Sequence, residues 1–340
     1  MKAPKEHHYV PKFHLKHFST NPERNEIGIY NLNNKMFFYR APIKSQAKEK
    51  LFYGDDDKME SWLSKLEYAV SIIIANLINH QIIPEIQTND YLRLLHFILI
   101  QYSRTKKRES EVNEQLDLLM SKTVERIPSA KPYQKERKIP ITEIISIANE
   151  ALPLLNYLNF QLIINETCMP FICSDNPVVL YNQLMEVKKS FSPGDSWASK
   201  GLQAFYPISP KHLLFWSDPS VYKSGGRKTR EIVATKNETD ILQINGLQYL
   251  NCNAQLFFNR AFKKDHLDQI ANSYYQIKFS AKPIVRQFGS YTFVTGENKK
   301  INLKLSFVKF NKYGKEFELG GRLVNLRHPS FHEIRKKIRD

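Results

Sequence analysis

The sequence has few cysteines and no long uninterrupted apolar run. Only three of its 340 residues are cysteine, Cys168, Cys173 and Cys252, and their spacing is not that of a zinc ribbon or a disulfide framework. The longest apolar runs, 70–78 and 92–100, contain polar side chains and are much shorter than the roughly 20 residues that a transmembrane helix needs. We therefore expect reduced cysteines in the core and no membrane span.

Several targeting and catalytic signatures are also missing. Residues 1–8 are not followed by the apolar stretch of a secretory signal, so we expect a cytoplasmic protein that begins here. The glycine-rich loops of P-loop NTPases and of dinucleotide-binding enzymes are absent. So are the Gly-x-Ser-x-Gly and His-Glu-x-x-His motifs, which disfavours α/β-hydrolase and zincin chemistry.

Positive charge is in clear excess. The chain has 50 Lys and Arg against 34 Asp and Glu, a formal charge of +16, while 42% hydrophobic and 12% aromatic residues are typical of a globular protein. Basic clusters occur along the chain, at residues 106–108, 135–138, 227–230, 299–300 and 335–339. Such a surface attracts polyanions, so nucleic acid is an expected partner, although solubility alone explains the charge equally well.

The residue pattern divides the chain into three regions. Residues 1–55 contain two β-like stretches, 26–31 and 36–39, joined by an asparagine-rich turn, and form an N-terminal β-hairpin region. Residues 56–158 are helical, and residues 159–340 return to short strands with two further helices. We expect an α+β fold, a helical core bundle packed with a mixed or antiparallel β-region, in one integrated globular unit.

Three helices are expected in the middle region. The first begins at Asp57, which forms a capping box with Glu60, and Pro84 ends it. The second covers 89–108 and is apolar on nearly every side, with a polar continuation to Arg126. The third covers 142–158 and is broken by Pro153.

The last region combines strands with two more helices. Short β-branched or aromatic stretches predict strands, at residues 160–164, 170–173, 178–181, 213–216, 290–294 and 301–310. A loop is expected over 183–201, and helices over 234–262 and 265–277.

Two adjacent histidines, His7 and His8, open the first candidate site. Adjacent residues of a strand point to opposite sides, so at most one of the two faces a given site, and we favour His8. An imidazole can serve as a metal ligand or a general base, or can be a hydrogen-bonded structural group. His14 and His17 are expected on the surface.

Glu60 and Glu67 are seven residues apart and so lie on nearly the same side of the first helix. Neither has Lys or Arg three or four positions away, which leaves each without an intrahelical partner. A carboxylate at the edge of a core needs a cation, either a basic side chain or a metal ion. The alternative is a solvated helix face.

Gln101 and Arg104 follow the most apolar run of the chain and lie on one side of the second helix. We expect Arg104 to pair with Glu60 or Glu67, a contact that is structural by itself but can also orient a site. Asp175 and Asn176 precede Pro177 in a turn between two strands. Their side chains either cap that turn or supply a metal-binding or proton-accepting carboxylate.

These segments together resemble the domain-of-unknown-function 4238 family. The matching pieces are His-His-Tyr-Val-Pro at 7–11, Phe52-Tyr53 before the spaced glutamates, Gln-x-x-Arg-Thr at 101–105, Ser-Asp-Asn-Pro at 174–177 and Tyr-Pro-Ile-Ser-Pro at 206–210. Lys106 stands where the family often has proline. The family is uncharacterised, so the resemblance implies a shared fold and shared residues but no reaction.

The sequence thus leads to two hypotheses. The first is a metal-dependent phosphodiesterase or nuclease, acting in phage defence or in a toxin-like role, in which Mg²⁺ or Mn²⁺ activates water. Its catalytic and metal-binding residues are His8, Glu60, Glu67 and Asp175, and its substrate-binding residues are His7, Gln101, Arg104 and Asn176. The second is a non-catalytic module that binds nucleic acid or protein, in which the same residues form a buried structural network.

Overall fold

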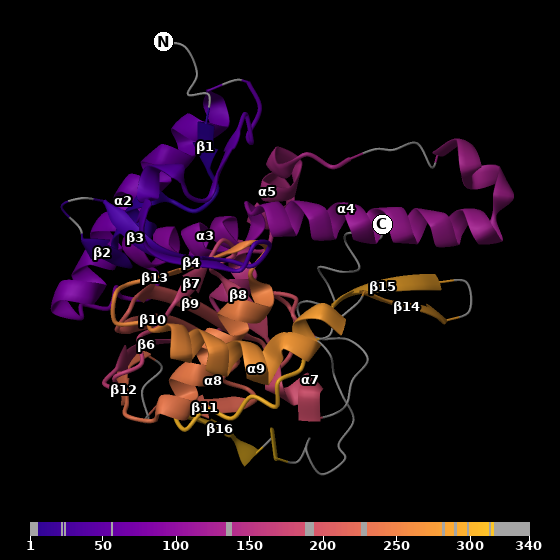
Figure 1. Cartoon of the computed structure of the whole chain (residues 1–340). Coiled ribbons are helices and arrows are strands. Elements are labelled where there is room, and N and C mark those ends of the chain that lie inside the picture. Colours follow the sequence, from indigo (N-terminus) through magenta and orange to yellow (C-terminus); the bar gives the residue numbers. More distant parts are fainter. Residues whose placement is uncertain are drawn as a thin grey trace.

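The computed structural model describes residues 6–315 except 22, 24, 56, 134–137, 188–193, 226–229, 281–282, 289–290, 298 and 313. The basic cluster 335–339 and most of the clusters 135–138 and 227–230 lie outside these described residues. The fold is mixed α+β, as the sequence predicts (Figure 1).

The centre of the fold is a five-stranded mixed sheet in the order β12-β6-β10-β9-β8. Its strands are β6 Asn159–Asn165, β8 Val179–Tyr181, β9 Gln203–Ser209, β10 His212–Ser217 and β12 Arg230–Thr235. Strand β12 runs parallel to β6, and the other pairs are antiparallel. The predicted strands 160–164, 178–181 and 213–216 are confirmed, whereas β9 was not predicted because Pro207 and Pro210 argue against a strand.

Strand β10 shows how the sheet separates two cores. Its successive side chains point to opposite faces. Leu213 and Phe215 join a core with Ile241, on α8 Glu238–Asn251. Leu214 and Trp216 join a second core with residues of α2 Lys58–His80 and α3 Asn89–Ser103. Helices therefore cover both faces of the sheet, with α2 and α3 on one side and α8 on the other (Figure 1).

The predicted second helix is in fact two helices. Helix α3 ends at Ser103, and α4 Lys106–Arg126 begins after Thr105, whose side chain accepts a hydrogen bond from Arg108 N. A threonine that caps a new helix start explains the break, which apolar periodicity alone does not reveal. The remaining helices are α1 Lys12–Lys16, α5 Ile141–Asn149, α6 Leu152–Leu155, α7 Gln183–Val187, α9 Lys264–Ser280 and the 3₁₀ turns Ile43–Ser45 and Pro128–Tyr133.

A second sheet joins the N-terminal region to the rest of the chain. Its order is β2-β3-β13-β7, with β4 on β3, and its strands are β2 Ser19–Asn21, β3 Glu26–Asn31, β4 Met36–Pro42, β7 Cys173–Ser174 and β13 Gln255–Phe258. The helix predicted over 234–262 was therefore wrong at its C-terminal end. Residues 255–258 pair with both β3 and β7, so long-range pairing decides their conformation.

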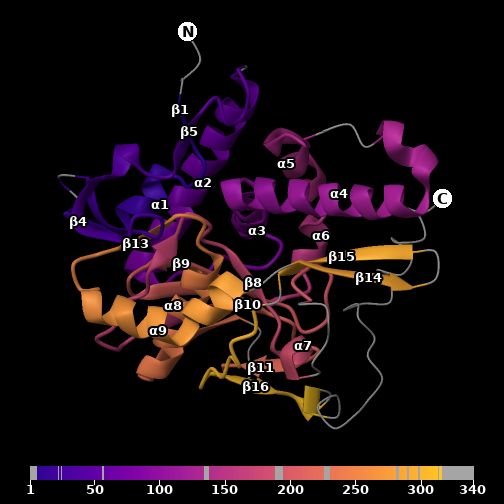
Figure 2. The same ribbon diagram turned by 45° about the vertical axis from the view of Figure 1, so that its right-hand side comes forward.

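The other strands form isolated pairs. They are β1 Glu6–His8 with β5 Lys48–Lys50, β11 Tyr222–Ser224 with β16 Val308–Phe310, and β14 Pro283–Phe288 with β15 Tyr291–Glu297. Helix α4 contacts β15, and this hairpin and helix extend from the same side of the molecule (Figure 2). No residue of α4 is buried, in agreement with its predicted surface position.

Two of the three cysteines are in the core, as expected. Cys173 and Cys252 are buried as free thiols, but Cys168 is exposed, so it is not a core residue.

Among the described residues, α2 is the one helix long and apolar enough to cross a membrane, with a mean hydropathy of 1.2 in its most apolar window. Val70, Ile74 and Leu77 of α2 are fully buried, but only 28% of this apolar window is buried in the fold.

The contact between α8 and α9 yields a test of the packing. A Cβ atom added to Gly246 of α8 would lie 2.2 Å from Cε2 of the buried Tyr274 on α9. We expect Gly246→Ala to lower the free energy of unfolding by about 1–3 kcal/mol, because overpacking outweighs the gain in helix propensity. Chemical denaturation measures this loss. Adding Tyr274→Leu should recover part of it, and the exposed Asn272→Ala serves as the control; an unchanged Gly246→Ala protein would refute the close contact.

Candidate functional site

A cavity of about 340 Å³ lies between the N-terminal segment and α2. It is lined by His8, Lys12, Phe13, Glu60, Ser64, Glu67, Tyr68 and Ser71. Three of the four predicted metal-binding residues, His8, Glu60 and Glu67, are thus brought together from two elements about 50 residues apart in the chain.

Strand β1 places its two histidines differently. His7 is fully buried and stacks on Tyr53, with ring centroids 5.4 Å apart and an interplanar angle of 13°. Its Nδ1 accepts a hydrogen bond from Tyr53 N at 3.1 Å, so in the neutral imidazole Nε2 carries the proton. That Nε2 is buried and makes no hydrogen bond with the described residues. His7 therefore does not line the cavity, whereas the half-buried His8 does.

Glu67 is held by a buried arginine. Arg104 is fully buried, and its Nη1 donates to Glu67 Oε1 at 2.7 Å. Burial alone would lower the pKa of Arg104, but the neighbouring Glu67 carboxylate and Tyr53 raise this pKa above the ordinary value. The predicted pairing of Arg104 with Glu60 or Glu67 is confirmed for Glu67.

Gln101 completes the network around Arg104. Its Oε1 accepts from Arg104 Nε at 2.9 Å and from Nη2 at 2.8 Å, while its Nε2 donates to the carbonyl oxygen of Tyr9 at 2.9 Å. Gln101 and Arg104 are both fully buried, so neither can contact a substrate directly. Their predicted substrate-binding role is corrected: they fix Glu67 and the β1 segment relative to α3.

Glu60 is in a different state from Glu67. Its carboxylate makes no hydrogen bond or ion pair with the described residues, although it is partly buried at the cavity. Burial raises the pKa of Glu60 and Glu67 adds to the increase, while His7, Arg104 and Lys12 oppose it. A carboxylate with a raised pKa is a stronger base than an ordinary one. Burial, and then Lys12, lower the pKa of His8 to about 4, so its imidazole is neutral at pH 7.

Asp175 does not belong to this cavity, so the prediction of one four-residue site was wrong. Its Oδ1 accepts from Asn253 N at 2.8 Å, and its Oδ2 accepts from Ala254 N at 2.7 Å and from Gln255 N at 3.0 Å. Asp175 is 2% exposed and fixes the chain where β13 begins. Asp175 therefore has a structural role as a backbone cap, but it caps residues 253–255 and not its own turn.

Asn176 also serves the fold. Its Oδ1 accepts from the hydroxyl of Thr105 at 2.8 Å, and its Nδ2 donates to the Asn251 carbonyl oxygen at 3.4 Å. These two contacts use both ends of its amide group, so the predicted substrate-binding role of Asn176 is corrected to a link between the α3–α4 junction and the end of α8.

Of the remaining N-terminal histidines, His14 is not on the surface as predicted, whereas His17 is partly exposed. His14 is fully buried, stacks on Tyr206 and is 2.8 Å from its hydroxyl oxygen through Nδ1. Burial lowers the pKa of His14 well below its usual range, and lowers that of the half-buried His17 to about 4. Residues Pro11 to His17 form α1 and its caps, so a short helix directs His14 inward.

Five residues of the cavity were not singled out from the sequence: Lys12, Phe13, Ser64, Tyr68 and Ser71. Tyr68 is 73% exposed. The helical spacing of Glu60, Ser64, Glu67 and Ser71 marks one stripe of α2. Extending that stripe would have identified Tyr68 beside Glu67; the sequence carries no comparable signal for Lys12.

The donor set of the cavity fits a hard divalent cation only in part. Within the part of the chain that the structure describes, no three His, Cys, Asp or Glu side chains are grouped closely enough to hold a metal ion. Mg²⁺, however, is often held by one or two carboxylates and several water molecules. The second oxygen of Glu67 is one such carboxylate donor, and the neutral His8 imidazole is a second donor of a softer kind.

The three hydrogen bonds of Asp175 predict a structural role that can be measured. Asp175→Asn replaces one acceptor oxygen with an NH₂ group that faces a backbone N–H. We therefore expect the free energy of unfolding to fall by about 2–4 kcal/mol. Thermal or chemical denaturation tests this value. If Asp175→Asn instead keeps wild-type stability, the carboxylate is not needed to hold β13.

The lowered histidine pKa values predict a pH dependence of stability. Between pH 6.5 and about 4, the unfolded chain protonates His8 and His17 while the folded protein keeps them neutral. The free energy of unfolding therefore falls as pH decreases through this window. Denaturation at several pH values should show a smaller fall in the free energy of unfolding for His17→Gln than for wild type. The difference in slope corresponds to up to about one proton fewer taken up on unfolding. An identical pH profile for His17→Gln would contradict this assignment.

Comparisons with known proteins support the resemblance seen in the sequence. A family model described as "Protein of unknown function (DUF4238)" matches residues 6–262, which includes the whole lining of the cavity and every motif named above. No curated protein and no solved structure matches the chain. Since the matched part is more than half of the chain, the protein belongs to the DUF4238 family.

Proposed function

We propose that the cavity between β1 and α2 is the active site of a divalent-metal-dependent phosphodiesterase that cleaves nucleic acid. The observation that carries the proposal is the Glu60 carboxylate, which lies in the cavity beside Glu67 and His8 without a hydrogen bond or ion pair to the described residues. Burial raises the pKa of this carboxylate, and a cation bound beside it would stabilise its charged form. Phage defence or a toxin-like role would be the setting of such an enzyme.

In this proposal Glu60, Glu67 and His8 have different roles. Glu60 accepts the proton of the attacking water, since burial makes it the stronger base. Glu67 is oriented by Arg104 through Oε1, which leaves its other oxygen for Mg²⁺ or Mn²⁺. His8, neutral at pH 7, offers a nitrogen lone pair to the same ion. When bound, the ion supplies positive charge for the phosphate oxygens and lowers the pKa of water.

Two further residues suit a nucleic acid. Lys12 lines the cavity and provides a cation for a phosphate group. Tyr68 lines the same cavity with most of its ring exposed, so a nucleobase can stack on it. A cation and an exposed aromatic ring beside two carboxylates match a single-stranded end or loop better than a smooth duplex, whose bases are already stacked.

The second candidate is a binding module without catalysis. It is favoured by the fully satisfied network of Gln101 and Arg104, and by Asp175, whose oxygens are all engaged with backbone N–H groups. In that case the polar motifs of the family maintain the fold, and the positive charge alone attracts nucleic acid.

Cleavage assays on Glu60→Gln separate the two candidates. Wild-type protein should cleave labelled single-stranded DNA or RNA with Mg²⁺ or Mn²⁺ and not with chelator, and Glu60→Gln should be slower by at least about 100-fold. Because Glu60 makes no hydrogen bond to the described residues, this variant should keep its melting temperature. Glu67→Gln should lose activity and stability together, since it weakens the partner of a buried arginine.

The matched control is Glu85→Gln, which also removes one carboxylate but lies on an exposed loop after α2. It should cleave like wild type. Salt-sensitive binding of DNA or RNA without cleavage, by wild type in either metal, would reject the enzyme and favour the binding module.

A further inference from the structure

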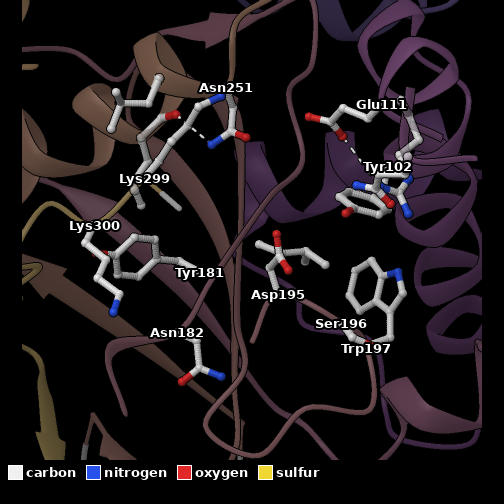
Figure 3. A pocket seen from close by; sticks show the side chains of 15 residues that line it. Tyr102, Glu111, Tyr181, Asn182, Asp195, Ser196, Trp197, Asn251, Lys299 and Lys300 are labelled. Atoms are coloured by element: carbon white, nitrogen blue, oxygen red, sulfur yellow. Dashed lines mark hydrogen bonds and ion pairs between the residues drawn. The ribbon is translucent and has the colours of Figure 1, made fainter. Parts of the chain in front are cut away.

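A second cavity lies away from the first, at the other side of the α3–α4 junction. Its volume is about 230 Å³. Its walls come from the end of α3, the first turns of α4, the ends of β8 and α8, and the segments 195–197 and 299–300 (Figure 3). Residues 299–300 lie outside residues 6–262, which the family model matches. The other lining residues of the cavity lie within that match.

One wall of this cavity is aromatic. Tyr102 meets the buried Trp197 edge to face, with ring centroids 5.4 Å apart and an angle of 82°. The Arg108 guanidinium lies over the Tyr102 ring at 5.2 Å, and its Nη1 is 3.4 Å from Glu111 Oε2. A planar group entering here meets flat, fixed rings and a guanidinium plane, which are the surfaces that bind nucleobases.

The opposite wall is cationic. Lys299 and Lys300 extend beside Tyr181, whose hydroxyl oxygen accepts a hydrogen bond from Ile301 N at 2.9 Å and so fixes this segment on β8. Figure 3 shows Asp195 between the two walls. With Arg108, three cations face two carboxylates, Glu111 and Asp195. Burial raises the pKa of Asp195 and Glu111 adds to this increase, while a backbone hydrogen bond, Arg108 and Lys299 oppose it.

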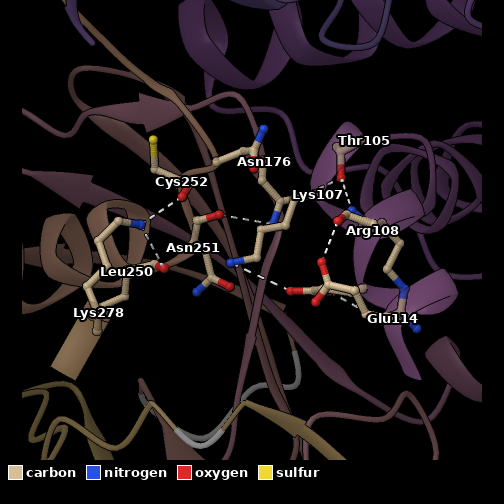
Figure 4. A network of polar contacts seen from close by, with 12 residues as sticks. Thr105, Lys107, Arg108, Glu114, Asn176, Leu250, Asn251, Cys252 and Lys278 are labelled. Carbon is tan, nitrogen blue, oxygen red and sulfur yellow. Dashed lines mark hydrogen bonds and ion pairs between the residues drawn. The ribbon is translucent and has the colours of Figure 1, made fainter. Parts of the chain in front are cut away.

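A polar network holds the walls in place (Figure 4). Lys278 of α9 donates to the carbonyl oxygens of Tyr249, Leu250 and Cys252 at 2.9, 3.3 and 2.7 Å, which neutralises the C-terminal end of α8. Asn176 joins that end of α8 to Thr105, the cap of α4. The cavity is therefore formed before a ligand arrives, and binding needs little reordering.

We propose that this cavity binds a mononucleotide. Its phosphate group would lie at Lys299 and Lys300, its base at Tyr102 and Trp197, and its sugar or amino groups would donate to Asp195 between them. The volume is below the roughly 300–1,000 Å³ of pockets for drug-sized ligands, so the cavity would enclose a mononucleotide only in part. The proposal does not depend on catalysis at the first cavity.

Calorimetric titration with AMP, GMP, CMP and UMP tests the proposal, with the nucleosides and inorganic phosphate as additional ligands. At least one mononucleotide should bind, and more tightly than its nucleoside or inorganic phosphate. The double variant Lys299→Ala/Lys300→Ala should bind it at least about tenfold more weakly, because two charged hydrogen-bond donors are lost. Equal affinity for inorganic phosphate and nucleotide, or binding of none of the four, would overturn the proposal.

Two further variants keep the result interpretable. The control variant Lys263→Ala/Lys264→Ala removes the same charge at the N-terminal end of α9, outside the lining of the cavity. It should bind the nucleotide like wild type. Asp195→Asn should weaken nucleotide binding without changing phosphate binding; equal effects on both ligands would contradict the assigned ligand orientation. Nucleotide binding is read by titration and cleavage by labelled DNA or RNA, so a failure of the phosphodiesterase proposal remains distinguishable from a failure of this one.

Discussion

The buried guanidinium of Arg104 is the constraint on which the rest of the candidate site depends. A charge removed from water needs both a counter-charge and hydrogen bonds for its donors, and Arg104 finds them in Glu67 and Gln101. Its guanidinium also lies 5.7 Å above the Phe97 ring centroid. Because Gln101 in turn donates to the Tyr9 carbonyl, Arg104 and Gln101 together link the segment after β1 to α2 and α3. If the N-terminal segment moved from the cavity, the Gln101 amide N–H would lose its acceptor, the Tyr9 carbonyl oxygen.

The same constraint separates two glutamates that look equivalent in the sequence. Glu60 and Glu67 lie on one stripe of α2 and line one cavity, yet only Glu67 is within reach of Arg104. Glu67 is then a fixed group whose charge is compensated, and Glu60 is a base with a raised pKa beside it. One neutralised and one available carboxylate form a more useful pair for proton transfer than two like charges repelling each other.

Much of this arrangement is readable from the residues. The alternation of His7 and His8, the azimuth of the two glutamates and the polar pair after an apolar run all follow from local geometry, and each involves spacing within one element. Asp175 was misplaced because the partners of its carboxylate, 253–255, are far away in the sequence and are backbone groups. Backbone N–H groups leave no trace in a residue pattern. Pairing of β13 with β3 is of the same long-range kind, and it overrides the helical pattern of residues 255–258.

The α3–α4 junction connects the two cavities physically. Gln101 and Arg104 turn toward the first cavity, while Tyr102 and Arg108 line the second. An unbroken helix would place residues 104 and 108 on the same face. Instead, Arg104 has φ −94° and ψ 31°, and Thr105 starts a new helix, so Arg108 turns back over Tyr102. Thr105 is itself bonded to Asn176, which holds the end of α8. The geometry of both cavities therefore depends on one capped break, whereas Glu60 and Lys299 each belong to a single cavity.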